Sequence, residues 1–555
     1  MAVPNPHLKA VFRQSRAQGG LTSAQDIHLR AAVMADSDRL DLLNGLAASG
    51  RLRSFAVDSN NGTLIGSYDK RAGLIELPAA SFRDRDLDTV VGVQALIADF
   101  ARKAWQDTAG QRHVVTQDMV DNLQATFNGS PALAAQIKSA VAQSHVQHFS
   151  LLGNGMAAGA TYDGSTADGT PKGINLPPAA LQSRTPGNPG GTYNAHDLTF
   201  VLGHEIQHGF NNAAKSQATL TFLDQVRRQA IERSAIHDYT DELRAYIGAG
   251  RADEAKAEIA GWNALLDRQR QARPHDDGLA LMLDTRNDRV LDFIRRNPSD
   301  PSKAIINPGL TFNPDGSLSA TPANIAAMGR HYFDRPSHLY AQAGQRPVAL
   351  GEGRPTPTAD YTNYYGTWAL ERIVAAEDRA NVRIQGARPH IAIDMAGLGL
   401  KEDLIEREGL DLGANRSPRP YLDTSRAPTM QGRFHHTQDG SMGHDHRHVP
   451  VADQARIGAS GDCVVDAWID ALQARDDAAA RAVQRAFLRS EAGQQLWPGG
   501  LDGAPHRAQE AEARPPLHPS RAAEWSPDEP ATQARHVMAE FAQPAPQGPQ
   551  HAMER

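Results

Sequence analysis

Three residues, His204, Glu205 and His208, form the pattern with the clearest chemical meaning in this chain, and the run from 204 to 208 reads His-Glu-Ile-Gln-His. On a helix, residues four positions apart lie on one face, so both imidazoles can bind one metal ion. Glu205 then lies beside that ion, where its carboxylate can take a proton from a metal-bound water. Two nitrogen ligands, a carboxylate base and an open coordination position are what a zinc hydrolase needs, so we expect one Zn²⁺ per chain here.

The residues around this motif predict the helix that must position it, over Leu198 to Phe210. Asn194 or Asp197 can cap its start. Apolar residues recur at helical spacing on one side, at Leu198, Val201, Leu202 and Ile206. The alternative is a surface helix that carries two histidines by coincidence, and this apolar stripe argues against it.

A catalytic zinc site usually has a third protein ligand, and we expect it in the helix that begins near Thr240. Glu242 lies in the first turn, and small Ala245 follows one turn later, which would let this helix approach the histidine helix closely. The sequence also leaves three neighbouring carboxylates open as ligands, namely Asp241, Asp238 and Glu232. A solvated acidic helix face is the alternative for all four residues.

With the motif from 204 to 208 and the Glu242-x-x-Ala245 pattern, the stretch from about Gly153 to Gly250 resembles the gluzincin-like HExxH zinc metallopeptidases. In that family, a glutamate from a following helix completes the metal site. The resemblance implies a zincin-like catalytic domain, with a small mixed sheet and an active-site helix. The metzincin pattern is excluded, because Asn211 and Ala214 stand where it requires glycine and histidine.

In many zincins a downstream histidine or tyrosine stabilises the oxyanion that forms during amide hydrolysis. His331 and Tyr332, which lie on an expected helix, are the candidates for that role here. Zincins also place a strand before the active-site helix, whose edge can hold a substrate chain. Residues 159–163 and 172–177 predict such a hairpin.

A second feature of the strands is an internal likeness. Tyr68-Asp69 is followed by a Leu-Pro-ended strand at 73–78, and Tyr162-Asp163 is followed by another at 173–177. Either a unit is duplicated, or the chain leaves a sheet in the same way twice. If it is duplicated, the N-terminal strands belong to the catalytic sheet. We also expect residues 54–57 and 64–68 to pair as a hairpin that turns at 60–62.

Composition narrows the classes of function. A net charge of −7 and a pI near 6.3 exclude a strongly basic surface for nucleic acid or anionic membranes. Cys463 is the only cysteine, so an intrachain disulfide and a thiolate metal cluster are excluded. No apolar run approaches the ~18 residues of a membrane span. The first residues show no Sec-type signal, so we expect synthesis in the cytoplasm and export by a dedicated secretion system to a target cell or the periplasm.

The predicted fold class is α+β, with a zincin-like catalytic domain in a mostly helical chain. We expect an N-terminal α/β segment at 1–112, the catalytic core at 113–300, a mainly helical region at 301–492 and a disordered tail at 493–555. The tail is rich in Pro, Ala and Gln, and a translocation signal or chaperone handle is the functional alternative for it.

Two further segments carry residues that could bind ligands. The tract from 434 to 448 is rich in histidine, and we interpret it as a solvated loop or an adventitious metal binder rather than a second functional site. The aromatic cluster from 361 to 368 could face a sugar or peptide, although packing against the core is the more common role of such residues.

Together these features predict a zinc-dependent amide-bond hydrolase. The absence of a signal peptide and of disulfides, the helical body and the tail resemble bacterial effectors of type VI or type IV secretion, some of which cut amide bonds of peptidoglycan. We therefore expect an antibacterial effector that acts on peptidoglycan, with secretion machinery, a chaperone or an immunity protein as partners. The alternatives are a metallopeptidase effector that cleaves proteins and a non-catalytic zincin-like binding protein.

Overall fold

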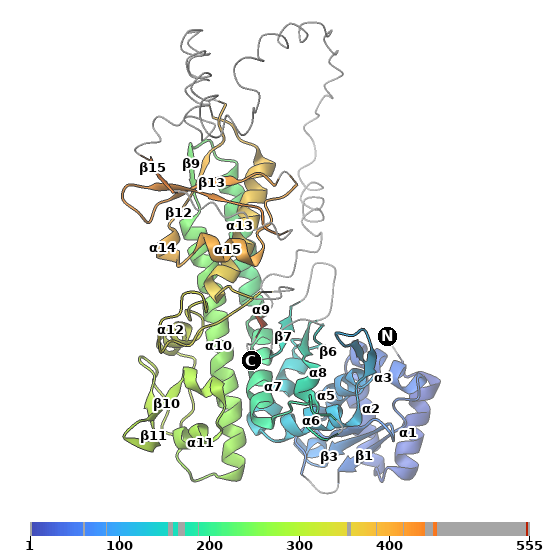
Figure 1. The fold of residues 1–555 in the computed structure, drawn as a ribbon. Coiled ribbons are helices and arrows are strands. Elements are labelled where there is room, and N and C mark those ends of the chain that lie inside the picture. The colour runs from blue at the N-terminus through green and yellow to red at the C-terminus, as the bar shows by residue number, and fades with distance from the viewer. Residues whose placement is uncertain are drawn as a thin grey trace, which may run out of the picture. The chain divides into compact units, whose positions relative to one another are not determined.

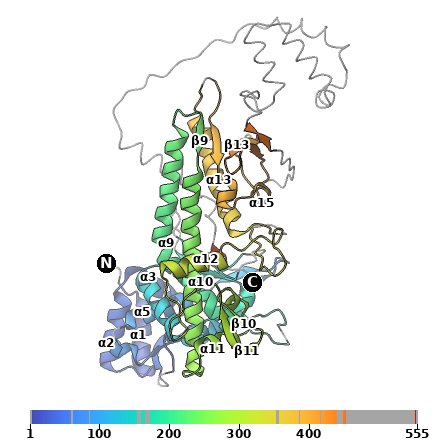
Figure 2. The same cartoon turned by 90° about the vertical axis from the view of Figure 1, so that its left-hand side faces the viewer.

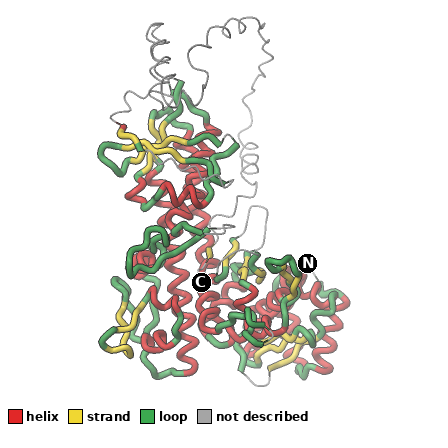
Figure 3. Tube along the Cα trace, viewed as in Figure 1, coloured by secondary structure: helices red, strands yellow, loops and turns green. Residues whose placement is uncertain are grey.

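The fold is α+β, as predicted, with many helices and several small sheets in the part of the chain that the computed structural model describes (Figures 1 and 3). The described residues are 3–58, 62–84, 86–153, 159–164, 172–186, 188–351, 357–384, 386–414, 416–438, 448–451 and 551–552. Cys463, the predicted tail apart from residues 551–552, the end of the helical region and most of the histidine-rich tract lie outside them. No described helix has the length and apolar content that a membrane crossing needs.

The chain divides into two compact units. The first comprises residues 1–223, 243–369 and 544–555, and the second comprises 224–242 and 370–543. This division cuts across the segments expected from the sequence, because its boundaries fall inside three long helices: α9 (Ala195–Ala230), α10 (Thr240–Ala272) and α13 (Tyr361–Ala380).

The first unit begins with three helices, α1 (Pro6–Gln18), α2 (Ser23–Met34) and α3 (Ser37–Ala48). Each starts at a side-chain cap, which Asn5, Thr22 and Asp36 provide by accepting a hydrogen bond from the first turn. A three-stranded sheet follows, of β1 (Ser54–Asp58), β2 (Ser67–Asp69) and β3 (Leu74–Pro78). The short helix α4 (Ser81–Asp84) and the buried helix α5 (Leu87–Phe100) come next.

The strand order in this sheet corrects one prediction. The order is β1-β3-β2, with β1 parallel to β3 and β2 antiparallel to it, so β1 and β2 do not form the expected hairpin. The hairpin is instead made by β2 and β3. Ile75 and Leu77 of β3 are fully buried. In the central position, this more apolar strand has a neighbouring strand along each of its two edges.

A second set of strands has the same topology. After β4 (Ala104–Gln106), β5 (Arg112–Val114), α6 (Gln117–Asn128) and α7 (Pro131–Ala142), the chain forms β6 (His148–Leu151), β7 (Thr161–Asp163) and β8 (Gly173–Leu176). β6 is parallel to β8, and β7 is antiparallel to β8, as the predicted hairpin requires. β16 (His551–Ala552) pairs antiparallel with the other edge of β7. The two sets form separate sheets, so the N-terminal strands do not extend the sheet that precedes α9.

The short helix α8 (Pro178–Leu181) connects this sheet to α9, which is far longer than the predicted helix. In the first unit α9 and α10 lie side by side (Figure 2). The unit then adds α11 (Gly278–Asp284), the 3₁₀ helix η1 (Asp288–Asp292), the β10 (Ile294–Asn297) and β11 (Asp300–Ile306) hairpin, and α12 (Pro322–His331). Trp262 of α10 is fully buried here and packs on Phe293 and Phe312.

The second unit is built on a five-stranded sheet of order β15-β14-β13-β12-β9. Its strands are β9 (Ile236–Asp238), β12 (His390–Ile393), β13 (Arg419–Asp423), β14 (Met430–Phe434) and β15 (Val449–Pro450). The first three along the sheet from β9 are parallel, and β14 and β15 continue antiparallel. Two short helices, α14 (Met395–Leu398) and α15 (Glu402–Glu408), connect β12 to β13.

Candidate metal centre

The predicted motif lies on α9 and is buried, with His204 and Glu205 both 0% exposed. The motif is buried because α9 and α10 are in close contact. A Cβ added at Gly203 would lie 2.9 Å from the Cβ of Ala264 and 3.2 Å from the Cα of Gly261. Only residues without long side chains allow two helix backbones to approach this closely, so the contact brings α10 carboxylates to the histidines.

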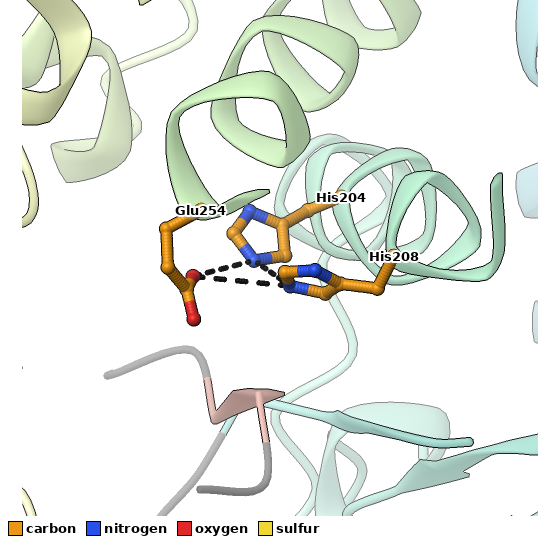
Figure 4. Close-up of side chains that lie close together, drawn as sticks. All are labelled: His204, His208 and Glu254. Carbon is orange, nitrogen blue, oxygen red and sulfur yellow. Dashed lines mark hydrogen bonds and ion pairs between the residues drawn. The ribbon is translucent and has the colours of Figure 1, made fainter. Parts of the chain in front are cut away.

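Three side chains converge at this point, those of His204, His208 and Glu254 (Figure 4). The two Nε2 atoms lie 2.9 Å apart, and Glu254 Oε2 lies 3.5 Å from that of His204 and 3.8 Å from that of His208. Ligand atoms at ~2.0–2.2 Å from a tetrahedral zinc ion are about 3.4 Å from one another. The three atoms therefore fit around one ion with only small movements.

The other nitrogen of each imidazole faces a carboxylate. His204 Nδ1 lies 3.1 Å from Glu258 Oε1, and His208 Nδ1 lies 3.1 Å from Asp253 Oδ1. The contact of His208 with Asp253 is a hydrogen bond, which can fix that ring and leave Nε2 free to bind metal, as is usual around histidine ligands. Glu258 lies at ion-pair distance from His204 without a hydrogen bond of that geometry. Asp253 is itself held by Asn211, whose Nδ2 donates to Oδ1 over 2.9 Å.

Glu254 is also fixed by a neighbour. Tyr365 of α13 donates from its hydroxyl to Glu254 Oε1 over 3.2 Å, and Lys215 Nζ of α9 donates to the same tyrosine oxygen over 3.2 Å. All these residues belong to the first unit. The carboxylate thus presents Oε2 to the two imidazoles while Oε1 is held in place.

Glu205 is buried and does not belong to the group of three candidate ligands. Neither of its carboxylate oxygens has a hydrogen-bond partner among the described residues. Burial raises the pKa of Glu205 well above its usual value, and the neighbouring His204 opposes that rise. A buried, unpaired carboxylate is costly, and such a group is typical of a site that receives a polar ligand.

The protonation of His204 also reflects its surroundings. Burial lowers its pKa, but the carboxylates of Glu254 and Glu258 more than offset this and raise the pKa to about 10. Without metal, His204 is therefore protonated, and its positive charge lies between the carboxylates of Glu254 and Glu258. A divalent cation supplies that positive charge and takes the proton's place, so the donor set fits a metal ion.

The structure groups Glu254, and not the predicted third ligand Glu242, with the two histidines. Glu242 is twelve residues before Glu254 on α10, which corresponds to about 18 Å along a helix. It belongs to the second unit, as do the alternatives Asp241, Asp238 and Glu232. None of these four is in the metal-binding group that contains His204 and His208.

The sequence around Glu254 carries the same pattern as the sequence around Glu242. Glu254 and Ala257 repeat the Glu-x-x-Ala spacing, and Ala257 is fully buried. Gly248-Ala249-Gly250 lies between Glu242 and Glu254 and disfavours a continuous helix, yet α10 runs through it without a break. Glycine costs only about 1 kcal/mol in a helix, which tertiary packing readily overrides, and Gly250 packs on the Tyr365 ring.

The two candidate oxyanion donors lie in different environments. The ring of Tyr332 is 6.1 Å from that of His204, and its hydroxyl hydrogen-bonds to that of Tyr361. His331 instead directs Nε2 to the carbonyl oxygen of Pro308 over 2.9 Å, away from the cluster. Of the two, Tyr332 alone lies near the candidate metal centre. Burial raises its pKa well above the usual value, so it stays a proton donor.

Two residues of the aromatic cluster from 361 to 368 have different partners. Tyr365 contacts Glu254, while Trp368 stacks on Tyr246 at 5.1 Å between ring centroids and is mostly buried. Both rings are therefore buried in the first unit, and Tyr365 lies at the candidate metal centre. Comparisons of the chain with protein-family models, with curated proteins and with solved structures find no match. The functional argument therefore rests on the geometry of this site.

Proposed function

We propose that the protein is a zinc-dependent hydrolase of amide bonds with a zincin-like site. The observation that carries the proposal is the position of an unpaired, buried Glu205 beside a three-residue cluster of metal ligands. A site that only binds metal has no use for this extra carboxylate, and burying it costs free energy. A hydrolase needs it as the general base.

Zinc is the metal that the donor set favours, because two imidazoles and one carboxylate are common ligands of catalytic zinc. Bound there, zinc would lower the pKa of a coordinated water and polarise the substrate carbonyl. Glu254 and the two histidines would hold the ion, while Asp253 keeps the His208 imidazole in the tautomer that exposes Nε2.

The residues of this chain divide the proton transfers between them. Glu205 accepts the proton of the attacking water and delivers it to the nitrogen of the leaving amine. Its raised pKa suits the second step, since the protonated form must persist until the amine leaves. The Tyr332 hydroxyl is the nearest of the predicted donors for negative charge that develops on the carbonyl oxygen.

The edge of β7 supports a chain-like substrate. Tyr162 of β7 lies against α9 at Gly209, directly after His208. The edge of β7 that faces away from β8 can accept an antiparallel strand, because β16 of the same chain pairs there. We propose the peptide part of peptidoglycan as substrate and an extended protein segment as the second candidate. Action as an exported antibacterial effector, with a chaperone or immunity partner, belongs to this proposal and stays a prediction.

One observation favours a second function, a zinc centre that stabilises the fold without catalysis. His204, Glu205, His208 and Glu254 are all nearly or fully buried in this structure, and structural zinc sites are closed to solvent. The test is the Glu205→Gln variant, assayed on peptidoglycan and on an unfolded protein such as casein. Hydrolysis by the wild type that this variant lacks supports catalysis, and stoichiometric zinc with no hydrolysis of either substrate by the wild type supports the structural role.

A further inference from the structure

The second unit contains another group of metal-ligand side chains, formed by Glu402, Glu406 and His435. Ligand atoms of these three residues all lie within 4.8 Å of one another. They are far from the first centre in sequence, and the proposed hydrolase reaction does not involve them. Part of the group comes from the histidine-rich tract, which the sequence alone suggested was a solvated loop.

Local structure brings these residues together. Glu402 and Glu406 are four residues apart on α15, so their carboxylates share one face of the helix. His435 follows the last residue of β14, and its Nδ1 lies 3.1 Å from Glu406 Oε1. The backbone amide of His435 also donates to that oxygen, over 2.7 Å, which fixes the end of the strand against the helix.

The Glu402 carboxylate is fixed by two further groups. The Tyr421 hydroxyl of β13 donates to Oε2 over 2.6 Å, and His448 Nε2 lies 3.2 Å from the same oxygen. Stacking of Tyr421 on Phe434, with 4.2 Å between ring centroids, holds the tyrosine in place. The first and last described parts of the histidine-rich tract thus meet at one pair of glutamates.

Burial gives this arrangement its chemical meaning. Glu406 is 0% exposed and Glu402 is 6% exposed. Two carboxylates on one helix face lose hydration and repel each other there, so a cation between them and the imidazole is stabilising. Imidazole together with carboxylates selects zinc or a similar transition metal, whereas calcium and magnesium prefer oxygen ligands alone.

We propose that Glu402, Glu406 and His435 bind a second divalent transition-metal ion, with zinc as the expected metal. Tyr421 and His448 orient the Glu402 carboxylate. The ligand atoms lie within 4.8 Å of one another and need to close in by at most about 1.4 Å to reach the ~3.4 Å spacing of a tetrahedral zinc site. The ion would join α15 to the end of β14 and so stabilise the second unit.

The experiment is the zinc content of purified full-length protein, measured by plasma mass spectrometry after loading with zinc and gel filtration. We expect two zinc ions in the wild type, one in His204→Ala, one in His435→Ala and none in the double variant. His390→Ala, which changes an exposed histidine of β12 in the same unit, is the matched control and should keep two.

The His204→Ala protein tests the second site without any change in the second unit, so misfolding of His435→Ala does not affect that measurement. If His204→Ala holds no zinc while the wild type holds one, the proposal is overturned. It is also overturned if a His444→Ala/His446→Ala variant loses the second ion and His435→Ala keeps it, since loop histidines would then be the binding groups. The count of the second ion is independent of hydrolase activity, so the two proposals can fail separately.

Discussion

Two regions of the first unit share one architecture and differ in their chemistry. In each, a first strand pairs parallel with a third, and a second strand pairs antiparallel with that third. A short helix then precedes a longer one. The long helix is α5 in the N-terminal region and α9 in the following one. The shared topology agrees with the predicted likeness of the two strand pairs, though the two regions form separate sheets.

The difference lies on the long helices. In α5, Gly92 is followed by Val93, Gln94 and Ile97, at the spacing at which Gly203 of α9 is followed by His204, Glu205 and His208. Each glycine lies in close contact with a neighbouring helix, since an added Cβ would meet Val141 or Ala264 at 2.9 Å. The same scaffold thus supports an apolar core in one region and a buried polar cluster in the other. The architecture positions the helix, and the residues on its buried face decide the chemistry.

The largest effect is expected when the proposed general base of α9 is replaced by the residue that α5 carries at that position. Glu205→Gln places the glutamine of α5 at the corresponding position of α9. We expect the rate of amide hydrolysis to fall about 10³–10⁴-fold, because the general base is lost while the metal ligands remain. Initial rates on peptidoglycan and on casein measure the fall, with zinc content as the control. Undiminished turnover in this variant would remove Glu205 from the mechanism.

The helix contact gives the next prediction. Gly203→Val introduces side-chain atoms within van der Waals distance of Ala264, so α9 and α10 must separate or the chain must strain. We expect a loss of about 1–3 kcal/mol in the free energy of unfolding, together with loss of zinc. Urea denaturation measures the stability. Gly45→Ala, at a helix position where an added Cβ meets nothing within 4 Å, is the control and should keep zinc.

The carboxylates behind the histidines give a smaller effect. Glu258→Gln and Asp253→Asn keep both imidazoles but weaken the groups that orient them. Zinc affinity should fall about 10–100-fold in each variant, as for other residues that support metal ligands. Competition with a chromogenic chelator measures the affinity. Unchanged affinity in both would show that the imidazoles need no such support.

The smallest functional effect is expected in the apolar region. Gln94 is buried and donates to the carbonyl oxygen of Ile65 over 2.8 Å, so Gln94→Ala should lower the free energy of unfolding by about 1–3 kcal/mol. Zinc content and hydrolysis should stay at the wild-type level. A loss of zinc in this variant would mean that the two regions are coupled rather than independent in function.

The sequence predicted the parts of the site that depend on local spacing. The positions of His204, Glu205 and His208 on one helix follow from the helical repeat, and the hairpin of β7 and β8 follows from strand and turn residues. The third ligand could not be predicted in this way. Glu254 reaches the site because Gly203 of α9 packs on Gly261 of α10, a contact between residues far apart in the sequence.

The order of the strands in the N-terminal sheet was the other feature that the sequence did not predict. The segments of β1 and β2 were recognised, but local turn residues indicated a hairpin, whereas β3 inserts between them. Placing a strand in the middle of a sheet depends on burial of its two faces, which the spacing of turn residues does not report. The same holds for His331 and Tyr332, adjacent in sequence, of which only Tyr332 lies near His204.

The most direct measurement of the central claim is the zinc content of Glu254→Gln and Glu242→Gln, prepared side by side in the His435→Ala background so that only the first centre is counted. Each variant replaces a glutamate of α10 with glutamine, so the chemical change is the same at both positions. The geometry predicts that Glu254→Gln loses most of its zinc after gel filtration and that Glu242→Gln keeps about one ion per chain. Full zinc in Glu254→Gln, or loss of zinc in Glu242→Gln alone, would contradict the metal centre of His204, His208 and Glu254.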